Sequence, residues 1–453
     1  MVGRLVNALV TGEPDAREHP YRRIIVGTMA GIAVGVLLMA GFAVFGFVVP
    51  GGADRWREPG SIVVEKETGT RYVYDGTRLR PVLNLASARL LFDKPPKLVE
   101  VSEKSLARVP RGQAVGIAGA PDTLPRNVDV TRQVWTTCAV TGHDAAGAPI
   151  IATTLSIGDL REAGSPAAAP LAADEATIVG AGKDSYLIWH GRRWKLTQAW
   201  QARVLGYDAA PYPVEPDWLD AVPVGPDLDA VQVPDRGTEG PLVDGVPARI
   251  GELFVARSAG QPDRYYLLRT DGLSQLNEVA YALVAADPET AKAYPGRPVA
   301  AVELSGAGLA SLASSRRPVL PDGAPEALPR MRQQPGGGWC VRQSMADGAV
   351  VVTDGPPPTS PVDNGLALTR TAQTADGIAV APGTGGVVYP GRAGQPPAGG
   401  YYLVVDSGVK FPLAGAEAAK RLGYPVAGAR PVPRQLLDML PTGPLLRVAP
   451  GGG

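Results

Sequence analysis

The chain has 453 residues, 45% of them hydrophobic, which is enough for two or three domains with proper cores. Lysine plus arginine equals aspartate plus glutamate at 44 each, so no excess of positive charge favours a nucleic acid or another polyanion as a partner. The 56 glycines and 45 prolines make about 22% of the chain, below the level of about 25 to 30% that suggests disorder throughout, so we expect a folded chain with many ordered loops.

An uncharged stretch of 26 residues, Ile24 to Val49, lies near the start of the chain. As a helix it spans about 39 Å, against about 30 Å for the hydrocarbon core of a bilayer, so it predicts a transmembrane helix. A secretory signal peptide is the alternative, but the apolar part of such a peptide usually has about 7 to 15 residues, and no clear small-x-small cleavage site follows Val49.

Basic residues predict the orientation of this span. Four arginines precede it: Arg4, Arg17, Arg22 and Arg23. After it, Arg55 and Arg57 are offset by Asp54 and Glu58. The positive-inside rule therefore predicts a short cytoplasmic arm and predicts that the 404 residues after Val49 lie on the other side of the membrane.

Three glycines in the span, Gly27, Gly31 and Gly35, are four residues apart and so share one face of the predicted helix. Because they carry no side chains, the backbone of another helix can approach closely, which predicts helix packing. Glycine is also common in membrane helices without such a role.

A short run of tyrosines and aliphatic residues, closed by one residue plus glycine, occurs four times in the exported part. The four runs are Arg71 to Gly76, Ser185 to Gly191, Arg264 to Gly272 and Gly400 to Gly408. Strand-forming residues followed by Asp-Gly, His-Gly or Ser-Gly predict a β-hairpin, because the turn needs positive φ. Four such hairpins predict a repeat protein, and repeats usually build surfaces rather than active sites.

The residues after each hairpin divide the repeats into two alternating types. In type A, Val99 to Ser102 and Val302 to Ser305 are extended runs ending in a serine that can cap a short helix. In type B, the phrase Leu-Gly-Tyr occurs at 205–207 and 422–424. Acids recur at matching positions: Glu100 and Glu303 in type A, Asp220 and Asp438 in type B. We interpret them as partners in local hydrogen bonds or as helix ends rather than as catalytic groups.

Two cysteines, Cys138 and Cys340, lie on the exported side, each near a tryptophan, Trp135 and Trp339. Outside the cytoplasm an even number of cysteines favours a disulfide, and no other cysteine competes for pairing. Because β-rich sequence surrounds both cysteines, we infer a central β domain assembled from two separated segments.

We therefore expect an α+β protein with one N-terminal transmembrane helix, followed by an elongated exported domain of four small α/β repeats around a central β-rich core. The expected divisions are a cytoplasmic arm at 1–23, the transmembrane helix at 24–49, repeat 1 (type A) at 60–112, a first core segment at 113–163, repeat 2 (type B) at 178–228, repeat 3 (type A) at 248–325, a second core segment at 328–390, repeat 4 (type B) at 398–445 and a disordered tail at 446–453.

The sequence carries no recognisable catalytic motif. The nearest approach to a phosphate-binding loop is Gly180 to Lys183, but Asp184 stands where a hydroxyl is needed and Thr177 where the first glycine is needed. The three histidines, His19, His143 and His190, are scattered without zinc spacing, and we interpret His190 as a turn residue. No Gly-x-Ser-x-Gly elbow occurs. We expect no catalytic, cofactor-binding or metal site.

Several features in order along the chain resemble the EccB family, the ESX conserved component B of type VII secretion machines in actinobacteria. These features are the Leu5 to Gly12 run, the basic Pro20 to Arg23 flank, the single membrane helix, the Gly60 to Pro81 segment, the Gly119 to Pro125 stretch, Trp135 with Cys138, and the A, B, A, B plan. The resemblance implies a membrane subunit that works in multiple copies with EccC, EccD and EccE. Family members are often labelled ATPases, although the resemblance makes the EccC motor the expected nucleotide hydrolase.

We therefore predict a structural membrane subunit whose exported domain scaffolds assembly, meeting its own copies or the cell wall. Two alternatives stay open at this point: an envelope enzyme that hydrolyses ATP or glycan, and a cell wall binding module on a tether. Exposed tyrosines such as Tyr266 and Tyr402 could stack on sugars, and strand packing is the simpler role for them.

Overall fold

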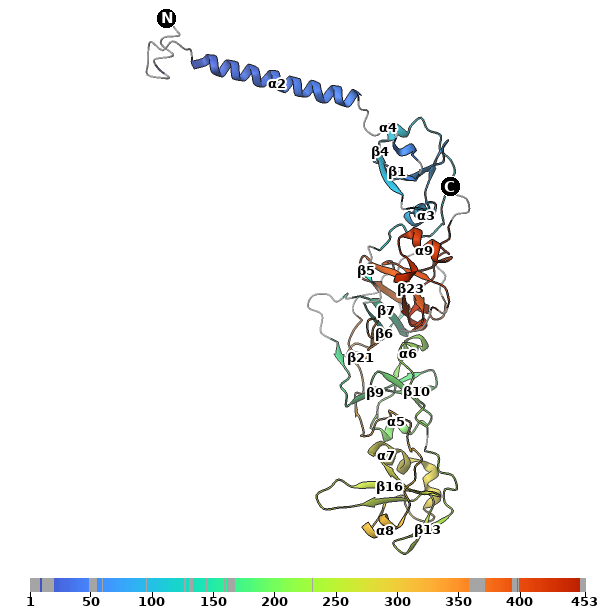
Figure 1. The fold of residues 1–453 in the computed structure, drawn as a ribbon. Helices are drawn as coiled ribbons and strands as arrows, with labels where there is room; N and C mark the ends of the chain where they lie inside the picture. Colours follow the sequence, from blue (N-terminus) through green and yellow to red (C-terminus); the bar gives the residue numbers. More distant parts are fainter. Residues whose placement is uncertain are drawn as a thin grey trace. The chain divides into compact units, whose positions relative to one another are not determined.

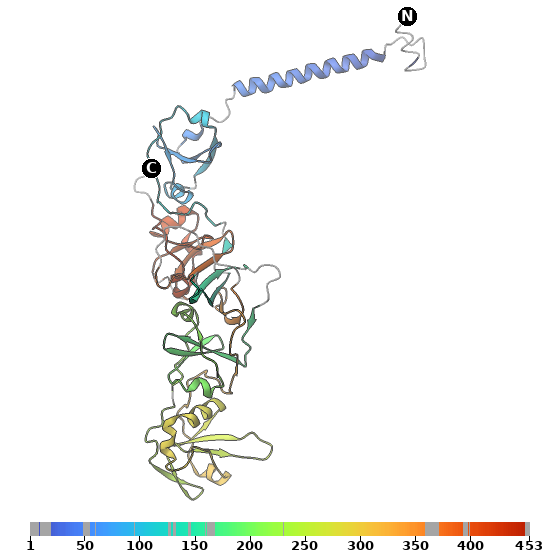
Figure 2. The same ribbon diagram turned by 180° about the vertical axis from the view of Figure 1, so that it is seen from behind.

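The computed structural model describes residues 9, 20–48, 55–58, 60–94, 96–125, 128–129, 133–143, 146–158, 160, 168–229, 231–357, 371–392, 397 and 399–448. The chain divides into two compact units (Figures 1 and 2): Met1–Leu83 with Lys94–Gly116, and Asn84–Asp93 with Ile117–Gly453. Most of the expected cytoplasmic arm and of the expected tail lies outside the described residues.

The first unit begins with the long apolar helix α2 (Pro20–Val48). Proline is favoured at the first position of a helix, where its missing N–H costs nothing. Within α2 the stretch Ile24–Val44 has a mean hydropathy of 2.3 and none of it is buried, so by length and composition it can cross a membrane. The helix begins four residues before the predicted span and therefore includes Arg22 and Arg23.

A four-stranded sheet completes the first unit. Its strands are β1 (Ser61–Glu65), β2 (Arg71–Tyr74), β3 (Leu79–Pro81) and β4 (Lys97–Val101). The first three form an antiparallel meander, and β4 then pairs in parallel with β1, which gives the order β3-β2-β1-β4. The short helices η1 (Arg55–Arg57) and α4 (Glu103–Leu106) flank it, and Trp56 and Leu106 are buried with Val63 and Leu79.

Three further sheets in the second unit share this strand order. Their strands are β9 (Glu175–Ala181), β10 (Asp184–Trp189), β11 (Arg192–Leu196) and β12 (Tyr212–Pro213); β15 (Leu253–Ala256), β16 (Arg264–Arg269), β17 (Gly272–Leu276) and β18 (Val302–Glu303); and β23 (Thr384–Pro390), β24 (Tyr402–Val404), β25 (Lys410–Pro412) and β26 (Arg430–Val432). In each, the fourth strand pairs in parallel with the first. The four hairpins predicted from the tyrosine runs are confirmed as β2–β3, β10–β11, β16–β17 and β24–β25.

A helix connects the third strand of each sheet to the fourth, and a second helix follows the fourth strand. The connecting helices are α3 (Leu85–Leu90), α5 (Gln201–Val204), α7 (Glu278–Ala286) and α9 (Ala416–Leu422), and the following helices are α4, α6 (Pro216–Ala221), α8 (Gly306–Ser311) and α10 (Arg434–Asp438). Ser305 caps α8 by accepting from the Gly308 N–H, as predicted, whereas Ser102 makes no such bond. The type B phrase Leu-Gly-Tyr ends a helix, because Gly206 and Gly423 adopt positive φ.

A six-stranded sheet lies at the centre of the second unit, in the order β22-β7-β6-β20-β21-β8. Its strands are β6 (Val134–His143), β7 (Pro149–Ile157), β8 (Ala169–Pro170), β20 (Trp339–Ser344), β21 (Val350–Asp354) and β22 (Gly377–Val380). Since β6 pairs with β20, the sheet joins two segments that are far apart in the sequence, as the sequence predicts.

The strand pairings differ from the expected divisions in several places. The fourth sheet begins at β23, before the expected start at 398, because β23 is the strand that pairs with both β24 and β26. The short strands β5 (Val128–Asp129) and β19 (Arg330–Met331), expected in the core segments, pair instead with β23 and β9. Helix α3 belongs to the second unit, where it contacts α9. The hairpin of β13 (Glu239–Val243) and β14 (Val246–Arg249) was not expected.

Candidate functional site: the cystine in the central sheet

The two cysteines lie directly opposite each other on β6 and β20. The Cα atoms of Cys138 and Cys340 are 4.0 Å apart and their sulfur atoms are 2.09 Å apart, so the pair forms a disulfide across 202 residues of sequence. Both residues are buried. The bond joins two strands that are already hydrogen-bonded neighbours, so it locks the pairing on which the central sheet depends.

The cystine and the tryptophans lie on opposite faces of this sheet. Successive side chains on a strand alternate between the two faces. Trp339 lies opposite Ala139, and Val341 opposite Thr137, on the face away from the cystine. On the cystine face, Thr154 of β7 lies opposite Cys138, and Thr353 of β21 opposite Cys340, which makes a buried row across four strands.

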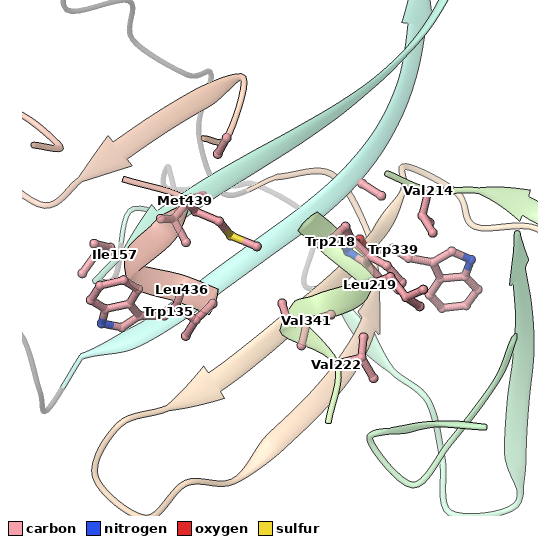
Figure 3. Close-up of a cluster of buried hydrophobic side chains, with 14 of the residues drawn as sticks. Trp135, Ile157, Val214, Trp218, Leu219, Val222, Trp339, Val341, Leu436 and Met439 are labelled. Carbon is pink, nitrogen blue, oxygen red and sulfur yellow. Dashed lines mark hydrogen bonds between the residues drawn. The ribbon is translucent and has the colours of Figure 1, made fainter. Parts of the chain in front are cut away.

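Helices α6 and the C-terminal end of α10 cover the tryptophan face (Figure 3). Trp218 and Leu219 of α6 join Trp339 in one buried cluster, and Leu436 of α10 joins Trp135 in the same cluster. The Trp218 indole N–H donates to the Trp339 carbonyl at 2.9 Å. The second and fourth small sheets are thus connected to the central sheet through the helices that follow their fourth strands.

An ion-pair network ties the second sheet to the segment that leads into β20 and to β21 of the central sheet. Arg332 donates to Glu175 at 2.8 Å and lies 3.5 Å from Asp354. The Ala172 N–H and the Arg332 guanidinium hold the pKa of Glu175 below its usual value. Because Glu175 is buried, these bonds fix the start of β9 against the segment before β20.

The matching acids of the type B sheets make local ion pairs, which confirms the local interpretation for both. Asp220 lies 3.0 Å from Arg193, and Asp438 lies 3.8 Å from Lys410. Lys410 also donates to the Leu437 carbonyl, and its burial lowers the pKa of its ammonium group. In the type A sheets, Glu303 lies 4.0 Å from Arg257, and Glu100 is exposed.

The segment nearest to a phosphate-binding loop is a β-hairpin. Gly180 and Ala181 end β9, Gly182 and Lys183 form the turn, and β10 returns antiparallel from Asp184. A phosphate-binding loop instead connects a strand to a helix whose N–H groups face the phosphate. The hairpin supplies no such helix.

His190 occupies the two-residue turn between β10 and β11, as predicted, with a φ of 48°. Its Nε2 lies 2.9 Å from the Ala173 carbonyl. The expectation that Tyr266 is exposed is wrong: only 6% of it is accessible, because it packs in the core of the third sheet. Tyr402 is half-buried against the central cluster. Strand packing therefore accounts for both tyrosines.

The glycines of α2 leave an open face. Apart from the neighbouring backbone of α2 itself, no atom of the described residues lies within 4 Å of where a Cβ would stand on Gly27, Gly31 or Gly35. Across the part of the chain that the structure describes, no group of three or more histidine, cysteine, aspartate or glutamate side chains could hold a metal ion.

Among the described residues, one helix near the N-terminus is long and apolar enough to cross a membrane, and small α/β sheets on a cystine-linked central sheet follow it. This combination is typical of a membrane-anchored structural protein. Residues 1–450 match the family model described as "Type VII secretion system ESX-1, transport TM domain B". The chain therefore belongs to the EccB family and is a structural membrane component of a type VII secretion system.

Relatives and solved structures agree with this family. The chain is 30% identical to the "ESX-3 secretion system ATPase EccB3" of Mycolicibacterium smegmatis, over 98% of this chain and 86% of that protein. It is similar to the structure of an EccB3 dimer from the ESX-3 core complex, with a TM-score of 0.63, 27% identity and coverage of 85% and 98%. It is also similar to the periplasmic assembly of the ESX-5 inner membrane complex, with a TM-score of 0.66, 26% identity and coverage of 85% and 93%.

Proposed function

We propose that this chain is the scaffold subunit of its secretion complex, with a cytoplasmic N-terminal arm, α2 across the membrane and the folded body on the other side. The apolar helix and the excess of arginine before it support this orientation. The buried cystine supports it independently, because disulfides persist in oxidising compartments outside the cytoplasm. The single observation that carries the proposal is the cystine-linked body behind one membrane helix.

We infer further that the body assembles in several copies with EccC, EccD and EccE type subunits. A related EccB3 forms a dimer within a core complex, and a related EccB chain is part of an inner membrane complex. The open glycine face of α2 suits close approach of a second helix backbone. Gly27, Gly31 and Gly35 then serve as packing positions.

The four small sheets act in this proposal as copies of one unit. The four sheets have the same strand order. Each also has an isolated parallel bridge between its third strand and the segment that follows its second helix. The bridges are Leu79 with Arg111, Arg193 with Val224, Leu273 with Ser314, and Lys410 with Thr442. A repeated unit of this kind multiplies contact surface rather than catalytic groups.

In this account the chain does not itself hydrolyse ATP, although its relatives are named ATPases. The sequence lacks the lysine and hydroxyl pair that follows the glycines of a phosphate-binding loop, and the hairpin at Gly182 supports the same conclusion. ATP turnover by the purified chain, at a rate that follows the chain through successive purification steps, would overturn this part of the proposal.

The test is purification of the tagged full chain from membranes of cells that encode its partners. We expect the EccC, EccD and EccE type subunits to copurify with it. A variant with leucine at Gly27, Gly31 and Gly35 should reach the membrane but recover fewer partners, because the added side chains block close packing. Ala33→Leu is the matched control, since it adds bulk on the opposite face of α2. Recovery of the wild-type chain alone refutes the scaffold role.

A further inference from the structure

The third small sheet carries a pocket of about 390 Å³ beside its third strand, β17. Polar side chains line part of it, among them Ser274, Ser315 and Arg317. Apolar residues of the following loop, including Pro318 and Leu320, form the rest. The loop is held in place from outside the pocket, because Leu320 packs against the core cluster that contains Trp194 of the second sheet.

Backbone hydrogen bonds identify the residues of the second and fourth sheets that are equivalent to Ser274 and Ser315 at this pocket. In the third sheet the Leu273 N–H donates to Ala313, and the Ser315 N–H donates back to the Leu273 carbonyl. The same pair of bonds joins Arg193 to Pro223 and Gly225 in the second sheet, and Lys410 to Pro441 and Gly443 in the fourth. Ser274 therefore corresponds to Trp194 and Phe411, and Ser315 to Gly225 and Gly443.

An aromatic ring fills this position in the second and fourth sheets. A Cβ added to Gly225 would lie 3.0 Å from the Trp194 ring, and one added to Gly443 would overlap the Phe411 ring. Trp194 and Phe411 are both buried. Glycine is required opposite each ring, because the ring occupies the space that a side chain would need.

Both members of this pair differ in the third sheet. The ring is replaced by the hydroxymethyl group of Ser274, and the glycine by Ser315, whose hydroxyl turns toward Asp271 at 3.1 Å. Ser274 is only 2% exposed, and its Oγ has no hydrogen-bond partner among the described residues. The third sheet thus lacks the ring that the second and fourth sheets contain, and a pocket lies beside Ser274 and Ser315. In the first sheet the same register places Arg80 opposite Gly112.

We propose that this pocket binds an aromatic side chain, tyrosine or tryptophan, presented by another polypeptide of the complex. The ring from the other polypeptide occupies, in the third sheet, the position that the chain's own Trp194 and Phe411 rings occupy in the second and fourth sheets. Arg317 lines the pocket, and its guanidinium, which lies 3.6 Å from Asp271, favours the face of an aromatic ring over a saturated one. A hydroxyl or indole N–H on the ring suits the polar lining, which includes Gln275 and Ser315. The pocket also contains Asp322 and Glu326, which disfavour an anionic ligand.

This inference rests on the proposed scaffold function for the identity of its partner, but the two can fail separately. Binding of a free side-chain analogue tests the pocket, and copurification tests the scaffold. The probes are 4-methylphenol and 3-methylindole, the side chains of tyrosine and tryptophan, with 4-methylcyclohexanol as a saturated analogue of similar size. N-acetyl-tyrosinamide presents the same ring within a peptide, so a preference for it over 4-methylphenol separates a peptide ligand from a free phenol.

The experiment is a ligand-observed NMR titration of the full chain in detergent, compared with a variant that carries Ser274→Phe and Ser315→Gly. This double variant rebuilds the Phe411 and Gly443 pair, so the pocket is filled by the chain's own ring. We expect saturable binding of both aromatic probes to the wild type and about tenfold weaker binding to the double variant. Because both proteins are in the same detergent, partition of the probes into micelles cancels in the comparison.

Two further variants keep the test decisive. Ser315→Gly alone leaves the pocket open and should retain binding. Ser274→Leu occupies the pocket with a side chain smaller than phenylalanine. It replaces the double variant if tryptophan fluorescence shows that the double variant does not fold. Equal binding of the aromatic probes to the wild type and to the filled variant overturns the proposal. So does binding of 4-methylcyclohexanol as tight as that of 4-methylphenol.

Discussion

Removal of the cystine tests how the central sheet is held together. The variant with serine at both Cys138 and Cys340 loses the covalent link between β6 and β20 without leaving a free thiol. The link spans 202 residues of sequence. Closing a loop of that length removes about 18 cal/mol/K of entropy from the unfolded chain, which is about 5 kcal/mol at 25 °C. We therefore expect the free energy of unfolding to fall by up to about 5 kcal/mol.

The variant should still fold, because the ladder between β6 and β20 does not depend on the bond. Paired positions run from Trp339 with Ala139 to Ser344 with Val134, and α6 still covers the tryptophan face. Urea unfolding of the full chain in detergent, followed by tryptophan fluorescence, measures the loss. Trp135 and Trp339 are buried on this sheet and contribute to the fluorescence change, together with the five other tryptophans of the chain.

Thr353→Ser provides the matched control, since Thr353 is the buried neighbour of Cys340 on β21. It removes one methyl group and should cost about 1 kcal/mol. Reduction of the wild-type chain should reproduce the effect of the double serine variant. A loss of stability no larger than that of the control, in both the reduced chain and the variant, would refute the argument from loop closure.

Three further substitutions have outcomes that follow from single contacts, each measured by the same urea unfolding. Glu175→Gln should cost about 1.5 to 3 kcal/mol at pH 7. Since the folded pKa of Glu175 is lowered, the carboxylate stabilises the fold above its unfolded pKa, and the gap in stability between the two proteins should narrow as the pH falls below about 4. A gap that does not narrow between about pH 5 and about pH 3 contradicts this. Trp218→Phe leaves the Trp339 carbonyl without the indole donor and should cost about 1 to 3 kcal/mol more than Trp194→Phe, because the Trp194 indole N–H has no partner among the residues that the structure describes. Equal losses in the two variants would remove the hydrogen bond from the account. Gly443→Ala forces a methyl group into the Phe411 ring and should cost about 1 to 3 kcal/mol, whereas Gly428→Ala meets open space and should cost little; a tolerated Gly443→Ala would contradict the close packing.

The sequence predicts what short-range patterns determine. The hairpins follow from strand-forming residues that end at a glycine, since both the strands and the turn are encoded within about ten residues. The end of α9 is equally local, because Gly423 takes the positive φ that closes the helix. The disulfide is predictable because Cys138 and Cys340 are the only two cysteines of the chain.

Long-range pairing is what the sequence does not reveal. Strands β12 and β18 contain two residues each, so they carry no periodic signal, and their place in a sheet depends on the strand beside them. The tyrosine runs mark the second strand of each sheet rather than the first, so the sequence places β23 in the second core segment instead of in the fourth repeat. That Cys138 stands directly opposite Cys340 is likewise a matter of register between segments far apart in sequence.

The burial of Tyr266 shows a signal that sequence reasoning could have used. The run from Tyr265 to Leu268 is aromatic or aliphatic throughout, which is typical of a strand buried on both faces. Tyr266, Leu267 and Leu268 are all buried. The pocket beside Ser274 had no sequence signal of this kind, because it becomes visible only when the hydrogen-bonded register equates Ser274 with Trp194 and Phe411.

The scaffold role is the central claim, and the native mass of the secretion complex tests it most directly. Membranes from a strain that lacks this chain are extracted in mild detergent, and an EccC type subunit is followed on a native gel. We predict that this subunit shifts to a smaller species without the chain, and that the full-size complex returns when the wild-type chain is restored. A complex of unchanged mass in the absence of the chain would contradict the account.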